Sequence, residues 1–218
     1  MRALLLLSLL LTPCVSTAGT IFIDFELSGS TLHFFGGLLE IPPDGSLSGV
    51  MTVALPGTGP TSAAAGPAEI TDLTLTADFA KTEFGATLSG TVGLTQIGAA
   101  AGTFAGDLTS LDVPMLSAGI TAHIECSGAT CSLFGTFPMD QDDTGSFANT
   151  SLVLADLIQP GMTSLLGTIE SAPGQSLIDL VGKETGRHYA VPEPATGTLA
   201  LLGLAVLAGQ SRRGRATR

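Results

Sequence analysis

Two cysteines and a histidine are the first residues whose spacing suggests chemistry. Cys126 and Cys131 enclose four turn-forming residues, and His123 precedes Cys126 by three positions. In a protein that leaves the cytoplasm, this spacing predicts a local disulfide across a hairpin. One alternative is a metal site made by these three side chains, which would need a fourth ligand that no nearby motif supplies. The other alternative is a pair of free thiols.

Two groups of carboxylates are further candidates. Asp140, Asp142 and Asp143 lie within one four-residue stretch, and oxygen-rich loops outside the cell bind Ca²⁺. Their spacing is not that of an EF-hand, so we favour an ordinary solvated turn over a weak calcium site and expect no metal. Asp24 and Glu26 fall on one face of a predicted strand, where a glycosidase pair is the alternative to an exposed polar face. We favour the exposed face.

Motifs of nucleophilic catalysis are missing from the sequence. It contains no Gly-x-Ser-x-Gly elbow, no His-Glu-x-x-His and no phosphate-binding loop ending in Gly-Lys-Ser/Thr. The three histidines, His33, His123 and His188, occupy unrelated contexts. The lack of Trp and the single Tyr disfavour sugar binding by aromatic stacking. We therefore expect no catalytic residue, no cofactor and no enzyme activity, with a secreted hydrolase of matrix polymer as the alternative.

The charge of the chain is distributed unevenly. Residues 19–191 carry three basic side chains against 18 acidic ones, a formal charge of −15, whereas four of the remaining arginines cluster at the C-terminus. Phosphate backbones and anionic membrane surfaces would repel such a body. Nucleic acid is therefore excluded as an expected partner, and the acidity is consistent with a soluble exported protein.

Period-two alternation of apolar and polar residues runs through much of the chain and predicts β-strands. Clear examples are residues 21–27, 70–79 and 84–94. In the last of these, Phe84 is predicted to lie on the apolar face. Turn-forming residues recur about every ten residues, with no strong amphipathic helix between strands. We predict an all-β fold, an antiparallel two-sheet sandwich or jelly-roll-like ectodomain. Residues 176–183 have some helical potential, and residues 183–190 are interpreted as a polar linker.

The chain begins with the three regions of a secretory signal peptide. A basic Arg2 precedes an apolar run, and small residues precede a predicted cleavage site after Ala18. We expect residues 1–18 to form a signal helix that is removed during export by the Sec machinery. A lipoprotein signal using Cys14 is the alternative, but Pro13 stands where a small residue is required.

The last 28 residues carry three features in a fixed order. The tripeptide Pro192-Glu193-Pro194 is followed by an apolar run, residues 199–208, and then by a basic tail with Arg212, Arg213, Arg215 and Arg218. The apolar segment and its flanks, about 15 residues, span ~22 Å as a helix, short of the ~30 Å hydrocarbon core. By the positive-inside rule the arginines would stay cytoplasmic, which leaves the tripeptide at the outer face of the membrane.

This order of features closely resembles the C-terminal sorting signal of PEP-CTERM proteins. The resemblance implies recognition by an exosortase, a membrane-embedded Cys protease and transpeptidase, after transient insertion into the inner membrane. It further implies removal of the tail and delivery to the surface or exopolysaccharide matrix of a Gram-negative bacterium. One departure is Gly197-Thr198, which separates the tripeptide from the apolar run slightly more than is common in the family. We expect this departure to be tolerated.

Together these predictions divide the chain into a signal peptide, residues 1–18, a β-rich exported domain, residues 19–190, and a sorting signal with a C-terminal hydrophobic helix, residues 191–218. Our leading hypothesis is a non-enzymatic protein of the cell surface or biofilm matrix. Its expected partners are an exosortase and the Sec machinery, with exopolysaccharide as a further candidate. The alternatives are the secreted hydrolase and an extracellular Ca²⁺- or ligand-binding module.

Overall fold

The computed structural model describes residues 19–34, 39–42, 44–107, 109–133, 135–172 and 174–191. The strands are β1 (Gly19–Glu26), β2 (Thr31–Phe34), β3 (Leu39–Ile41), β4 (Gly45–Gly59), β5 (Ser62–Ala63), β6 (Gly66–Glu83), β7 (Ala86–Gln96), β8 (Ala100–Phe104), β9 (Ser110–Gly128), β10 (Met139–Ala155), β11 (Ser164–Ala172) and β12 (Gln175–Ala190), with a 3-10 turn, η2, at Cys131–Leu133. The all-β, antiparallel prediction is confirmed. The predicted signal helix and C-terminal hydrophobic helix lie outside the described residues.

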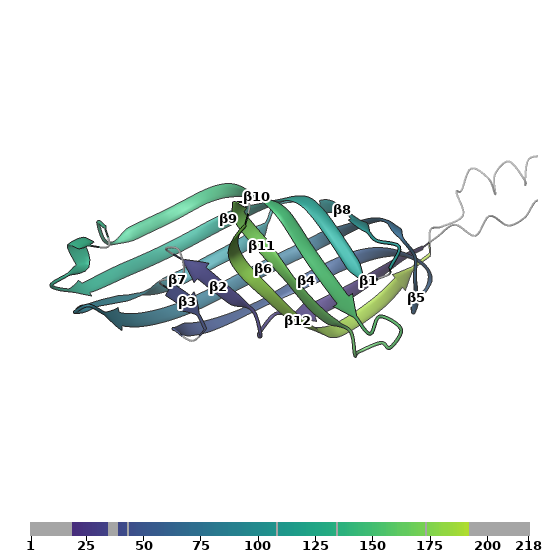
Figure 1. Ribbon diagram of the computed structural model, residues 1–218, viewed down its shortest axis with the longest axis horizontal. Helices are drawn as coiled ribbons and strands as arrows, with labels where there is room; N and C mark the ends of the chain where they lie inside the picture. The colour runs from purple at the N-terminus through teal and green to yellow at the C-terminus, as the bar shows by residue number, and fades with distance from the viewer. Residues whose placement is uncertain are drawn as a thin grey trace, which may run out of the picture.

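These strands form one antiparallel sheet that closes on itself. Its order is β1-β4-β6-β7-β9-β10-β11-β12, and β12 pairs with β1 to complete the circuit. β2 and β3 form a hairpin attached to β12, β5 pairs with β4, and β8 pairs with both β6 and β9. The two layers of the predicted sandwich are thus joined by a continuous hydrogen-bond ladder. In Figure 1, β10, β11 and β12 cross in front of β4 and β6, so the two layers enclose the core between them.

A single hydrophobic core fills the interior of the closed sheet. β1 alternates as predicted, with Ile23 and Phe25 fully buried. On β6 the inward positions shift from Ile70 to Leu73, because the register against β4 slips by one residue at Thr71. This β-bulge keeps apolar side chains on the inner face on both sides of it, and it curves the strand around the core.

Three local predictions are wrong. Residues 176–183 and the eight residues ending at 190 belong to β12, so the first segment is not helical and the second is not a linker. Phe84 does not lie on the apolar face of β7. It occupies the preceding turn, 74% exposed and with a positive φ of 51°. The hydroxyl of Thr130 donates a hydrogen bond of 2.7 Å to the Phe84 carbonyl, which ties this turn to the loop after β9.

Candidate functional site

The last strand leads directly into the segment predicted to be a sorting signal. β12 ends at Ala190, whose register partner on β1 is Thr20. Gly19 and Val191, the first and last described residues, therefore leave the body side by side, at one end of its long axis (Figure 1). The approach is so close that a Cβ on Gly19 would lie 2.5 Å from the ring of Tyr189. This contact fixes the exit of the chain relative to the sheet.

A buried ion pair anchors the end of β12. The side chains of Arg187 and Glu184 are 4% and 1% exposed, and two contacts of 2.8 and 2.9 Å join the guanidinium to the carboxylate. The guanidinium also donates to the Leu157 carbonyl and to the Thr163 hydroxyl. The backbone N–H of Thr163 donates to the Glu184 carboxylate at 3.0 Å. The network therefore holds the loop between β10 and β11 against the strand from which the C-terminal segment departs.

The protonation state of this pair is set by two opposing effects. Burial alone would raise the pKa of Glu184, but hydrogen bonds from Arg187 and from Thr163 outweigh it and hold the pKa below its ordinary value. Glu184 is thus held as a carboxylate at neutral pH. Neither residue was predictable as part of a buried pair, because a Glu and an Arg in a polar stretch have the same pattern as exposed side chains.

The residues that follow this anchored strand match a known motif. Positions 190–215 match the PEP-CTERM protein-sorting motif. The chain is a PEP-CTERM domain-containing protein. In this PEP-CTERM protein the match begins at Ala190, the last residue of β12, so the motif starts where the sheet ends. No curated protein and no solved structure matches the chain.

The predicted signal residues can now be placed against the match. The tripeptide Pro192-Glu193-Pro194 lies inside the PEP-CTERM match, as do Arg212, Arg213 and Arg215, whereas Arg218 lies beyond it. These residues and Ala18 fall outside the described part of the structure, so their individual roles stay predictions. Over the residues that the structure does describe, no helix is long and apolar enough to cross a membrane.

The predicted disulfide is confirmed. Cys126 and Cys131 are bonded, with their Cα atoms 5.7 Å apart. The bond closes the loop that follows β9, at the end of the body opposite residue 191 (Figure 1). Because both sulfurs are in the bond, neither can act as a thiolate ligand. The alternative metal site with His123 is therefore ruled out for this form of the protein.

The clustered aspartates lie on a strand and not in the predicted turn. Asp140, Asp142 and Asp143 all belong to β10. In the ladder with β9, Asp140 is opposite His123 on the outer face, and Asp142 shares that face, whereas Asp143 is opposite Ile120 on the inner face. Strand alternation thus separates the carboxylates. Among the described residues, no three His, Cys, Asp or Glu side chains are gathered to hold a metal ion.

His123 forms an exposed, pH-sensitive contact on this outer face. Its Nδ1 lies 2.5 Å from the carboxylate of Asp140, and its Nε2 lies 3.5 Å from that of Glu125. The hydrogen bond with Asp140, together with the attraction of that charge, raises the pKa of His123. The raised pKa favours the protonated imidazolium, which pairs with the Asp140 carboxylate on the exposed face of the sheet.

A second histidine lies near a serine and an aspartate, but in the wrong order for a catalytic triad. Asp179 accepts a hydrogen bond of 2.6 Å from the Ser176 hydroxyl and lies 3.0 Å from Nε2 of His33. In a Ser–His–Asp triad the imidazole lies between the other two, where it can take the serine proton. Here the carboxylate lies between them. The remaining histidine, His188, stacks on Phe22 with 4.6 Å between ring centroids.

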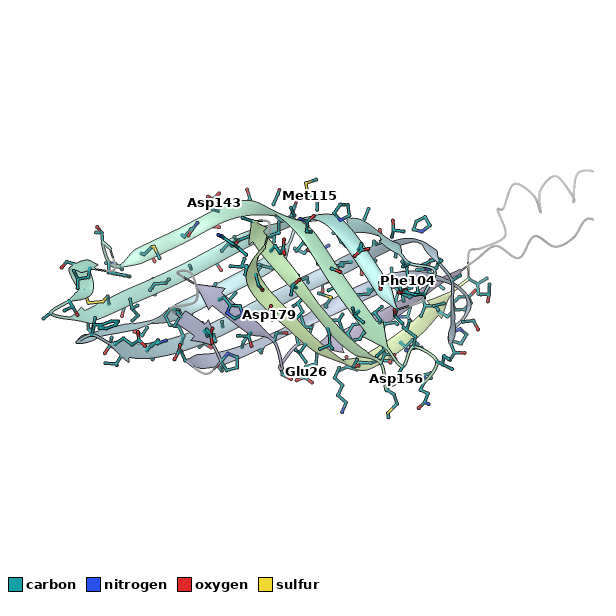
Figure 2. All side chains as sticks on the ribbon, viewed as in Figure 1. Glu26, Phe104, Met115, Asp143, Asp156 and Asp179 are labelled. Carbon is teal, nitrogen blue, oxygen red and sulfur yellow. A yellow bond between two sulfur atoms is a disulfide. The ribbon has the colours of Figure 1, made fainter. Side chains whose placement is uncertain are left out.

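The carboxylate pair of β1 lies on an outer face, as predicted. Asp24 and Glu26 alternate with the buried residues of the strand. The hydroxyl of Thr52 donates a hydrogen bond of 2.7 Å to Asp24, while Glu26 is exposed at the lower margin of the molecule in Figure 2. Asp24 therefore has a cross-strand partner that orients it within the sheet, which is consistent with a polar strand face.

Proposed function

We propose that this chain is a non-enzymatic protein of the bacterial cell surface or exopolysaccharide matrix, exported by the Sec machinery and sorted by an exosortase. The observation that carries the proposal is the PEP-CTERM motif at residues 190–215. In this proposal residues 1–18 direct export and are removed after Ala18. The C-terminal segment then enters the inner membrane transiently and is processed, which releases the β-sheet body.

The shape of the body suits such an arrangement. The chain leaves the sheet at one end of the long axis, and the disulfide loop lies at the other (Figure 1). With residues 199–208 in the membrane, the sheet would project from the bilayer and would place the disulfide loop farthest from it. The formal charge of −15 over residues 19–191 favours this projection, since anionic lipid headgroups repel it.

Processing of the tail, as opposed to permanent anchoring, is supported by length. The apolar segment spans ~22 Å as a helix against a hydrocarbon core of ~30 Å, so it is a poor permanent anchor. The fixed exit at Val191 holds the tripeptide within a few residues of the folded sheet. An enzyme that cuts there must therefore approach the end of the body formed by β1 and β12.

The test is intact-mass analysis of the protein recovered from the producing cells and from their matrix. We expect the mature wild-type protein to lack residues 1–18 and the apolar tail, and a strain without the exosortase to retain the tail. The variant P192A/E193A/P194A should behave in the wild-type strain as the wild-type protein does in the deletion strain. The control variant Q159A/P160A changes exposed residues of the loop between β10 and β11 and should be processed normally.

Two results would defeat the proposal directly. If the wild-type protein in its normal cell still carries residues 199–218 after reaching the surface, the tail is a membrane anchor and not a sorting signal that is removed. If the tripeptide variant is processed as fast as the wild type, the motif does not direct the cut.

A further inference from the structure

An apolar cavity lies inside the closed sheet, away from the end where the chain exits. Its volume is about 140 Å³, and it is lined by eight apolar side chains and the amide of Gln141. Leu75 and Ala77 of β6 and Val92 and Leu94 of β7 supply one wall. A cavity of about 150 Å³ with such a lining stays dry and binds benzene in an engineered lysozyme. The side chains that line such a void lack dispersion contacts on that side, and a bound apolar group would supply them.

The cavity reaches the surface where the closed sheet is interrupted. β10 pairs with β11 only from Ala148 onward, whereas residues 139–147 pair with β9 alone among the described strands. Gln141 lies in this half of β10 and is exposed, and Leu177 across the gap on β12 is half-buried. Both residues line the cavity. The cavity thus has a solvent-accessible side between β10 and β12, flanked by Gln141 and Leu177.

One carboxylate lies on the cavity side of β10 near this opening. Asp143 shares the inner face with Gln141 and is opposite Ile120, itself a lining residue, whereas Asp140 and Asp142 lie on the outer face. Figure 2 places Asp143 on β10 along the margin of the sheet. This carboxylate would repel an anionic headgroup and attract a cationic one.

We infer that the cavity is a binding site for the apolar end of a small uncharged or cationic amphiphile. The ring or short alkyl chain occupies the space between β6, β7 and β12, and the headgroup stays at the opening beside Gln141 and Asp143. The inference is independent of sorting, because it concerns the folded body alone. It assigns a ligand class to an extracellular module of otherwise structural character.

The experiment is a titration followed by the methyl NMR signals of Val92, Leu94 and Ile120. It uses the exported protein released by the producing cells and handled without detergent, because detergent tails would compete for the cavity. Benzene is the neutral probe, and n-pentylammonium and hexanoate share a five-carbon tail but differ in charge. We expect saturable shifts of these methyl signals with benzene, and at least about tenfold tighter binding of n-pentylammonium than of hexanoate, since the energies of two opposite headgroup charges beside the Asp143 carboxylate differ by more than ~1.4 kcal/mol.

Matched variants of β6 separate binding in the cavity from binding elsewhere. Ala77→Leu fills the cavity and should weaken benzene binding more than about tenfold, because about three added carbons occupy the ligand volume. Ala80→Leu makes the same change at an exposed position of the same strand and should leave binding unchanged. If Ala77→Leu fails to fold, Ala77→Val should fold and weaken binding by a smaller factor.

Three outcomes would overturn the inference. The first is the absence of any saturable shift, which would make the cavity a packing defect. The second is benzene binding that survives in both Ala77 variants. The third is hexanoate binding as tight as that of n-pentylammonium, which would show that the Asp143 carboxylate at the opening does not select the ligand.

Discussion

Replacing Arg187 by Met should be among the most damaging single changes in the body. The substitution leaves the Glu184 carboxylate, whose side chain is 1% exposed, without its guanidinium partner. Removing one member of a buried ion pair typically costs about 3–5 kcal/mol, because the remaining charge stays desolvated. The free energy of unfolding of a domain is about 5–15 kcal/mol, so the loss is a large part of the total.

Urea unfolding followed by far-UV circular dichroism measures this loss, since the chain has no Trp to report by fluorescence. With a slope of about 2 kcal/mol per molar urea, the midpoint of R187M should fall by roughly 1.5–2.5 M. The double variant E184L/R187M removes both charges and should recover most of the loss. Lys183→Met, an exposed change on the same strand, should alter stability by less than about 0.5 kcal/mol.

The pH dependence of the loss gives a second test. In the wild type the depressed pKa of Glu184 contributes stability above about pH 4.3, its ordinary value, and this contribution disappears as the pH falls through the folded-state pKa. In R187M the guanidinium no longer offsets the effect of burial, so the pKa of Glu184 should be raised. The cost of the unpaired buried carboxylate should then vanish once Glu184 is protonated. The stability gap should therefore be widest near pH 7 and narrow below about pH 4. A gap that is absent at pH 7, or a double variant as unstable as R187M, would refute the reasoning.

Two further predictions concern the opposite end of the body. The disulfide closes a loop with a sequence separation of 5, so C126S/C131S should lose about 2 kcal/mol in urea unfolding, and an unchanged midpoint would contradict a stabilising role. Asp140→Asn should lower the pKa of His123, measured by NMR titration of its ring proton. The control D142N, on the same face, should leave that pKa unchanged. Equal effects of the two substitutions would contradict a specific contact between His123 and Asp140. Because the pKa of His123 is raised in the folded state, its contribution is complete below about pH 6.5 and is lost as the pH rises through the folded-state value.

Local patterns in the sequence predict the strands well where an apolar face is unbroken. β1 and the second half of β6 alternate as expected, and the short spacing of Cys126 and Cys131 predicts their bond correctly. These features depend on residues within a few positions of one another. The sorting motif was also predictable, since its residue types and their order are contiguous.

Features that depend on distant partners were not predictable. Glu184 occupies an inward position of β12, where the pattern requires an apolar residue, and only its pairing with Arg187 and Thr163 makes burial tolerable. The strand was therefore mistaken for a linker. Closure of the sheet depends on β1 and β12, which are separated by nearly the whole body, and no local signal encodes that pairing. The same holds for the cavity, whose lining residues come from six strands.

The antiparallel pairing of β1 with β12 also determines how the body would respond to mechanical force. A pull on Val191 that is resisted at the disulfide end runs along the second half of β12, while its hydrogen bonds to β1 lie across that direction. The seven register pairs from Thr20 to Glu26 would then be strained in shear and would have to break together. The hydrogen bond from Arg187 to the loop between β10 and β11 also joins β12 to that loop. A force applied between this end and the disulfide end would thus be resisted by the β1–β12 ladder in shear.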